Sequence, residues 1–186
     1  MLLKSEIPTH PTSWSADGRF ILYTVVDPKT NNDIWVLPLA GDRQPFLFLQ
    51  TPFIEASASF SPDGRWIAYQ SDDQGLSEVY VQTFPASGSK WQISTDTGAF
   101  PIWRKDGKEL FYVTQGALMA VEVKPGNSFE AGVPKMLFDL AAVRVRGAPV
   151  FAATADGQRF LIVGQTQETT SLQYTVVVNW QADLKK

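Results

Sequence analysis

The apolar residues of this chain recur with the two-residue period of β-strands, and no segment shows the period of an amphipathic helix. The stretch SFSPDGRWIAYQ (residues 59–70) shows this clearly, because a turn separates two strand-like runs within it. Pro62 presets φ at the first turn position, Asp63 can accept hydrogen bonds from backbone amides, and Gly64 tolerates a positive φ. Trp66 and the residues after it have the aromatic and β-branched content of a strand. The stretch therefore predicts a β-hairpin.

Turns of this kind occur four times. The Asp-Gly pairs are Asp17-Gly18, Asp63-Gly64, Asp106-Gly107 and Asp156-Gly157. Their glycines are 46, 43 and 50 residues apart, which indicates an internal repeat. The third and fifth residues after each glycine are apolar, which predicts that one face of each second strand is buried. These residues are Ile21 and Tyr23, Ile67 and Tyr69, Leu110 and Tyr112, and Phe160 and Ile162.

Further strands are predicted in each repeat. The third strand is expected at residues 33–37, 78–82, 117–121 and 174–180, and a weaker outer strand at 45–50, 91–95 and 134–139. Four strands in a repeat of about 45 residues are typical of propeller blades. We therefore predict an all-β fold, a single β-propeller domain over residues 1–186 with four four-stranded antiparallel blades. The repeats are expected at about 6–51, 52–95, 96–139 and 140–186. A sandwich of unrelated hairpins is the alternative, and the constant strand order argues against it.

The turn residues are interpreted as structural. Four aspartates in four different blades could suggest a metal or acid–base set, but each lies where a side chain satisfies turn amides. A large ring just before the turn is expected to wedge between neighbouring blades. Trp14, Phe60 and Trp103 occupy this position in three repeats, and Ala153 occupies it in the fourth.

The amino-acid composition narrows the classes of binding partner and of chemistry that are open to this chain. Apolar residues make up 44% of the chain and charged residues 19%, a globular composition with no run long enough to span a membrane. The net charge of −3 and the scattered basic residues give no footprint for nucleic acid. The nearest approach to a basic patch is VRVRG (143–147), whose two arginines are interpreted as a solvated loop or strand face. The absence of cysteine excludes disulfides and thiolate chemistry.

The second and third repeats carry a family resemblance. The stretches FSPDGRWIAYQSDDQGLSEVYVQTFP and KWQISTDTGAFPIWRKDGKELFYV resemble the WD-like repeats of TolB-type β-propellers. They are especially similar to the propellers at the C-termini of bacterial serine/threonine protein kinases. The resemblance implies a propeller that is closed by about six to eight blades. It also allows an extracytoplasmic location, whereas a native start at Met1 would favour the cytoplasm. The chain has no glycine-rich phosphate loop, His-Arg-Asp motif or Asp-Phe-Gly motif.

The sequence contains few residues that could form a catalytic or metal site. The nearest string to a nucleophile elbow, Gly75 to Val79, lacks the second glycine, and His10 is the only histidine. The oxygen-rich segments 27–33 and 71–75 lack EF-hand spacing and read as solvated turns rather than calcium loops. We predict no enzyme activity, cofactor or metal. A recognition module for a protein, peptide or small ligand is the favoured function. The alternatives are an architectural domain, a regulatory module detached from a kinase, and a hydrolase or lyase that uses the propeller channel.

One face of the propeller is expected to bind a ligand. The loops that enter each first strand (6–12, 52–58, 96–101 and 140–149) should lie with the loops that join the second and third strands. The candidate ligand-binding residues are His10, Glu55, Asp96, Arg144 and Arg146, with an ordinary solvated loop as the alternative for each. The last entering loop is the longest and is the candidate lid.

The chain is also expected to form a homodimer. Offset by one repeat, residues 2–5 align with the outer strand of the first blade, and no outer strand follows Trp180 in the fourth. We therefore expect residues 2–5 to close a blade that ends with YTVVVNW (174–180) and to hide its edge. Because the chain starts with Met1 and carries this closing strand, we expect it to be complete. Two copies would then form a two-fold ring of eight blades.

Overall fold

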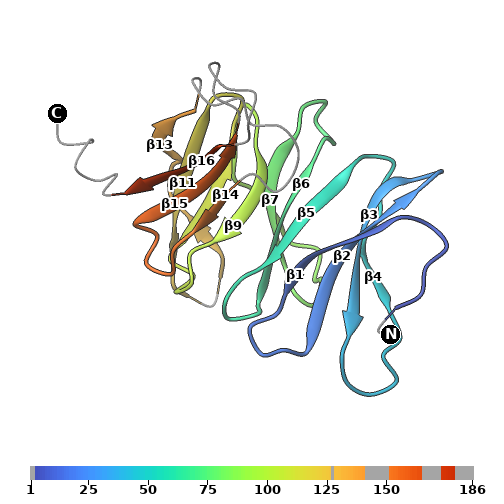
Figure 1. Ribbon diagram of the computed structural model, residues 1–186. Helices are drawn as coiled ribbons and strands as arrows, with labels where there is room; N and C mark the ends of the chain where they lie inside the picture. The colour runs from blue at the N-terminus through green and yellow to red at the C-terminus, as the bar shows by residue number, and fades with distance from the viewer. Residues whose placement is uncertain (1–2, 127, 141–150, 165–172, 179–186) are drawn as a thin grey trace. The chain divides into compact units, whose positions relative to one another are not determined.

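The computed structural model describes residues 3–126, 128–140, 151–164 and 173–178 (Figure 1). Every regular element in these ranges is a β-strand. None of the described residues forms a helix that is long and apolar enough to cross a membrane. The chain consists of two compact units, Met1–Pro101 and Ile102–Lys186, which are described separately.

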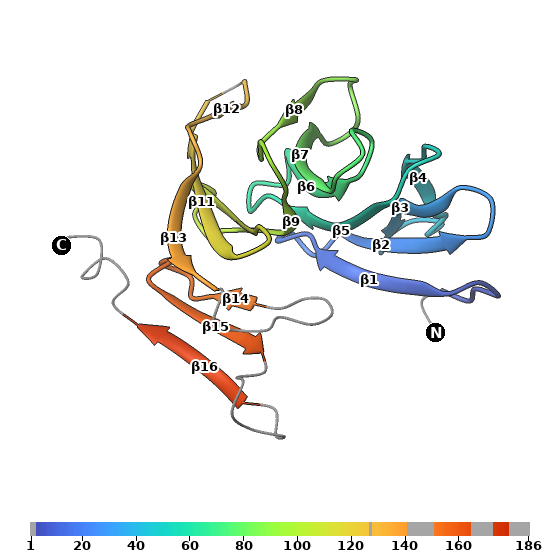
Figure 2. The same ribbon diagram turned by 90° about the horizontal axis from the view of Figure 1, so that it is seen from above.

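The first unit contains two four-stranded antiparallel sheets. The first sheet has the order β1 (Thr9–Trp14), β2 (Phe20–Asp27), β3 (Asn31–Pro38), β4 (Phe46–Leu49). The second has the order β5 (Glu55–Phe60), β6 (Trp66–Ser71), β7 (Glu78–Thr83), β8 (Lys90–Gln92). Strand β5 contacts β1, β2 and β3, so that the second sheet packs on the first (Figure 2). Each sheet is a simple meander in which consecutive strands pair, as in a propeller blade.

The second unit continues the pattern. Its first sheet has the strands β9 (Ala99–Trp103), β10 (Glu109–Val113), β11 (Ala117–Lys124) and β13 (Lys135–Asp139), and β9 begins just before the boundary between the units. The two-residue strand β12 (Glu130–Ala131), which the pattern did not predict, pairs with the end of β11. The last sheet has the order β14 (Phe151–Ala153), β15 (Arg159–Gly164), β16 (Gln173–Val178).

All four Asp-Gly pairs lie in the turn between the first and second strands of a sheet. The glycines have φ of 70° to 73°, a left-handed backbone that favours glycine. In each turn the aspartate Oδ1 accepts the backbone N–H two residues later, at 3.0 to 3.1 Å. Local turn chemistry therefore accounts for the repeated motif.

The core of the first unit lies between its two sheets. Leu22, Ile34 and Val36 of the first sheet form one buried cluster with Phe60 and Tyr69 of the second. The Phe84 ring, which follows β7, packs on this cluster and contacts four other phenylalanine rings with centroids 5.1 to 6.4 Å away. Aromatic and aliphatic burial between sheets is therefore the main stabilising interaction in this unit.

The prediction that the second strands bury one face is confirmed at seven of its eight positions, and Ile21 is half-buried. In three of the four repeats the other face is buried as well, because the fourth residues after the turn glycine, Leu22, Ala68 and Phe111, are completely buried. These strands lie in the middle of their sheets and are covered on both faces. Alternation holds only in the fourth repeat, where Leu161 is 40% exposed between the buried Phe160 and Ile162.

The expected aromatic wedge is only partly correct. Phe60 is 6% exposed and belongs to the cluster between the first two sheets, as a wedge should. Trp14 is 63% exposed, so that it does not act as a wedge within the first unit. Trp103 is half-buried, and its ring meets the Phe129 ring edge-on at 6.4 Å.

The proposed closing strand begins in residues that lie outside the described part. Residues 3–5 carry no strand in the single chain, and Leu3 packs against Tyr23, Val25 and Leu37 of the first sheet. Residues 179 and 180 of the expected last strand also lie outside the described residues. Pairing of residues 2–5 with a fourth blade stays a prediction about an assembly.

Candidate functional site

Four loops at one edge of the first unit form a continuous surface. They are residues 28–30, 50–54, 72–77 and 93–98, which we call the entry rim. The first two loops are joined by Gln50, whose Nε2 donates to Thr30 Oγ1 at 3.3 Å. The Ile54 N–H donates to Asp72 Oδ1 at 2.7 Å and joins the next pair. The Gly98 N–H donates to the Ser77 carbonyl oxygen at 2.7 Å and joins the last. In the first unit, the loops that enter β5 and β9 therefore meet the loops that join second and third strands.

Buried carboxylates anchor the rim from below. Asp33 Oδ2 accepts hydrogen bonds from Thr30 Oγ1 at 2.7 Å and from Gln50 Nε2 at 2.8 Å. Glu78 Oε2 accepts a hydrogen bond from Ser94 Oγ, which itself accepts the Val79 N–H at 2.7 Å. Each acid stands at or near the start of a third strand and ties it to the segment after the outer strand. These two acids stabilise the loops rather than face solvent.

Glu55 is a third buried acid beneath the rim. It is 1% exposed, and its Oε1 accepts hydrogen bonds from Thr51 Oγ1 and, at 3.4 Å, from Ser71 Oγ. Its Oε2 and the Oδ1 of Asp33 have no hydrogen-bond partner among the described residues. Burial raises the pKa of the Glu55 carboxyl, and the nearby Asp33 charge adds to the effect, while the hydrogen bonds from Thr51 and Ser71 oppose it.

Apolar side chains lie on the outside of the same rim. Phe53 and Ile54 are exposed on the loop before β5, and Leu76 is 57% exposed on the loop between β6 and β7. The hydrogen bond from Ile54 to Asp72 holds these two loops together, and Phe53 is fixed further by its N–H bond to Thr51 Oγ1 at 3.1 Å. Large apolar residues that rigid loops hold in solvent are typical of contact sites.

The structure separates the sequence-predicted site residues. Asp96 is exposed on the entry rim, whereas Glu55 is buried beneath it and cannot meet a ligand at the surface. His10 was expected in the loop that enters the first strand. It is exposed, but it lies within β1, opposite Thr24. Arg144, Arg146 and the candidate lid at residues 140–149 fall outside the described residues, except for Leu140.

The exposed Phe53, Ile54 and Leu76 were missed by sequence reasoning. Apolar residues in a strand-rich chain are normally assigned to the core. A usable signal was present, because Pro52 and Gly75 mark these residues as loop residues rather than strand residues.

The oxygen-rich segments use their carboxylates within the protein. Asp27 Oδ1 accepts the Lys29 N–H at 2.8 Å, which is a turn contact. Asp73 accepts hydrogen bonds from Tyr80 Oη at 2.6 Å and from Lys90 Nζ at 2.5 Å. No group of three or more histidine, cysteine, aspartate or glutamate side chains that could hold a metal occurs within the described ranges.

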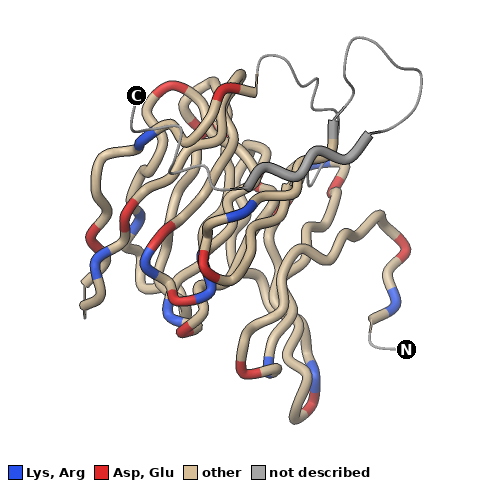
Figure 3. The backbone as a smooth tube through the Cα atoms, turned by 60° about the vertical axis from the view of Figure 1, so that its left-hand side comes forward, with Lys and Arg blue, Asp and Glu red and all other residues tan. Residues whose placement is uncertain are grey.

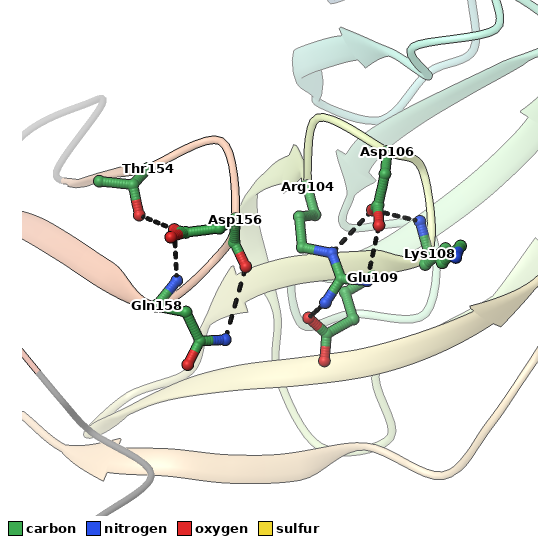
Figure 4. Close-up of polar contacts among 7 residues, drawn as sticks. All are labelled: Arg104, Asp106, Lys108, Glu109, Thr154, Asp156 and Gln158. Atoms are coloured by element: carbon green, nitrogen blue, oxygen red, sulfur yellow. Dashed lines mark hydrogen bonds and ion pairs between the residues drawn. The ribbon is translucent and has the colours of Figure 1, made fainter.

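The Asp-Gly turns carry charge pairs that differ between repeats. In the first two turns, Arg19 and Arg65 donate to the preceding aspartates at 2.6 and 2.7 Å. In the third turn, the arginine that pairs with the aspartate precedes it in the chain. Arg104 Nε and Nη2 donate to Asp106 at 2.7 and 2.8 Å, and Arg104 Nη1 donates to Glu109 Oε2 at 2.5 Å (Figure 4). Acidic and basic residues are accordingly mixed along the described backbone (Figure 3).

Comparison with known proteins identifies the fold. No family model matches the chain, and no curated protein matches it. The structure is similar to TolB from Acinetobacter baumannii, with a TM-score of 0.73 and 19% identity over 96% of this chain and 43% of that one. It is similar to a putative TolB from Agrobacterium tumefaciens, with a TM-score of 0.61 and 20% identity over 74% of this chain and 51% of that one.

A protein named for enzyme activity shares the same architecture. An oligogalacturonate lyase in complex with manganese has a TM-score of 0.69 and 13% identity, over 97% of this chain and 53% of that one. The chain therefore has a TolB-like β-propeller fold, and it spans about half the length of these three proteins. The fold occurs in proteins with and without enzyme names, so that function has to be argued from the site.

Proposed function

We propose that the chain is a non-catalytic recognition module that binds a peptide or protein segment at the entry rim. The observation that carries the proposal is the exposure of Phe53, Ile54 and Leu76 on loops that are hydrogen-bonded to one another. Apolar and aromatic anchors at the centre of an interface usually supply most of its binding energy.

The hydrogen bonds of the rim support this role through preorganisation. A flexible loop loses conformational entropy when a ligand immobilises it, at about 0.5 to 1.5 kcal/mol for each ordered side chain. The bonds from Ile54 to Asp72 and from Gly98 to Ser77 remove much of this freedom in the free protein. A partner that places an apolar side chain beside Leu76 would therefore bind to a surface that is already in place.

Selection of peptides from a random phage-displayed library tests the proposal. Peptides enriched on the wild-type chain are synthesised with a fluorophore, and their dissociation constants are measured by anisotropy. The double variant Phe53→Ser/Leu76→Ser removes both anchors at exposed positions, where the cost to folding is small. We expect it to bind at least about tenfold more weakly, which corresponds to roughly 1.4 kcal/mol.

The matched control is Val133→Ser, which removes an exposed apolar side chain in the second unit. We expect Val133→Ser to leave the dissociation constants unchanged. Equal binding by the wild type and the rim variant, or failure of the library to yield any specific peptide, would contradict a recognition site at the entry rim.

The catalytic alternative can be tested in the same preparation. The similar lyase was solved with manganese, so oligogalacturonate is incubated with the chain and Mn²⁺ and the products are separated by chromatography. We expect no cleavage. Cleavage that depends on protein concentration would replace the proposed function by a lyase.

A further inference from the structure

One repeat position shows that the last described sheet has an uncovered face. The fourth residue after the turn glycine is completely buried in the first three repeats, as Leu22, Ala68 and Phe111. Leu22 is covered by the second sheet, and Phe111 meets Phe160 of the following sheet edge-on at 5.0 Å. The fourth copy of this position, Leu161, is 40% exposed. Among the residues that the structure describes, the side of the sheet that elsewhere receives the next blade is therefore open at β15.

The open side is hollowed. A shallow depression of about 310 Å³ lies there. Its lining residues are Ala152, Ala153, Thr154, Arg159, Phe160 and Leu161. Small alanines occupy β14, where the first repeat has Ser13 and Trp14 at the matching places. The hollow is therefore suited to receive a bulky apolar side chain.

The first sheet presents such a side chain. Phe60 stands four residues before its turn glycine and packs in the same buried cluster as Leu22 of the preceding sheet. Trp14 holds the same position in the first repeat, and it is 63% exposed. Phe60 corresponds to Trp14 in the repeat, and Leu22 corresponds to Leu161. The same pairing at the next junction would therefore place Trp14 against Leu161. The larger ring of Trp14 matches the smaller residues around the hollow.

We propose that a second copy of this chain covers both open faces, with Trp14 of each copy seated against Leu161 of the partner subunit. The occupant is argued from the repeat, because the internal pairing of successive blades already shows how these two faces fit. One chain spans about half the length of the propeller proteins that it resembles, which leaves room in a ring for the blades of a second copy. Two identical junctions related by a two-fold axis would give a ring of eight blades, within the usual range of four to eight. This inference rests on the fold and not on the ligand-binding role of the entry rim.

Cysteine cross-linking tests the predicted contact directly, because the natural sequence has no cysteine. Trp14→Cys and Leu161→Cys chains are prepared separately, mixed after brief unfolding in urea and refolding together, and oxidised. We expect a disulfide-linked dimer on a non-reducing gel only in the mixture. Trp14→Cys alone should stay unlinked, and a mixture of Val133→Cys with Leu161→Cys measures cross-linking by random collision.

Three results would overturn the proposal. They are no cross-link in the mixture, an equal yield in the Val133→Cys control, and an intrachain disulfide in a monomeric Trp14→Cys/Leu161→Cys double variant. Sizing by light scattering adds a test that needs no disulfide. Trp14→Ala alters a side chain that is exposed in the single chain, so it should fold and elute as a monomer. A Trp14→Ala protein with the same mass as the wild type would also contradict the proposed contact.

Discussion

Replacement of Gly157 by alanine should destabilise the protein much more than the same change at Gly18. Both glycines have a left-handed backbone, with φ of 70° and 73°, so both variants lose about 1 to 2 kcal/mol from that conformation. At Gly18 a new Cβ would have no heavy atom of the described residues within 4 Å, apart from those of its two chain neighbours. At Gly157 the new Cβ would lie 2.8 Å from Arg104 Cδ and 3.0 Å from Phe111 Cζ. Overpacking of this kind costs about 1 to 3 kcal/mol more.

The Arg104 side chain cannot retreat easily from this clash. Its guanidinium is bound by both Asp106 and Glu109, and the Phe111 ring is fixed against Phe160. We therefore expect a loss in unfolding free energy of about 1 to 2 kcal/mol for Gly18→Ala and about 2 to 5 kcal/mol for Gly157→Ala. Urea unfolding followed by tryptophan fluorescence, at one protein concentration, measures both. Losses that agree within about 0.5 kcal/mol would refute the packing of this turn on Arg104.

Three further changes probe other parts of the structure. Phe84→Ala should cost about 2 to 4 kcal/mol in urea unfolding, because it removes a ring that contacts four others, and a loss below about 1 kcal/mol would contradict this packing. Arg104 hydrogen bonds hold the pKa of Asp106 at about 2. Asp106→Asn should therefore lower the melting temperature at pH 6, and this difference should vanish as pH falls from about 4 to 2; a pH-independent difference would count against it. Burial raises the Glu55 pKa above 4.5, so its ionisation costs stability as pH rises through the folded value. The stability of the Glu55→Gln variant relative to the wild type should therefore be higher at pH 8 than at pH 4. The opposite trend would show that Glu55 is not desolvated.

Local chemistry made the turns and strands predictable. An Asp-Gly pair specifies a positive φ and an acceptor for turn amides within a few residues, and neither depends on the rest of the fold. The same holds for the two-residue period of strands such as β6. The short strand β12 was missed because two residues carry no periodic signal.

Burial and exposure depend on which sheets pack together, and for that reason they were predicted less well. The two-residue period assigned Ile21 and Tyr23 to a buried face and left Leu22 unassigned, and the second sheet covers Leu22. Glu55 reads as a loop carboxylate at a binding face, and it is buried beneath the rim. No role was assigned to Leu76 from the sequence, and a loop exposes it. In each case the side chain is ordinary, and its environment is set by residues far away in the sequence.

The mass of the wild-type chain in solution tests the two-chain propeller most directly. Sedimentation velocity over a range of micromolar concentrations needs no variant and no ligand. Because each junction would bury the open faces at both Trp14 and Leu161, we predict one species of twice the 20.6 kDa chain mass at every concentration. A single species of 20.6 kDa throughout would contradict the account.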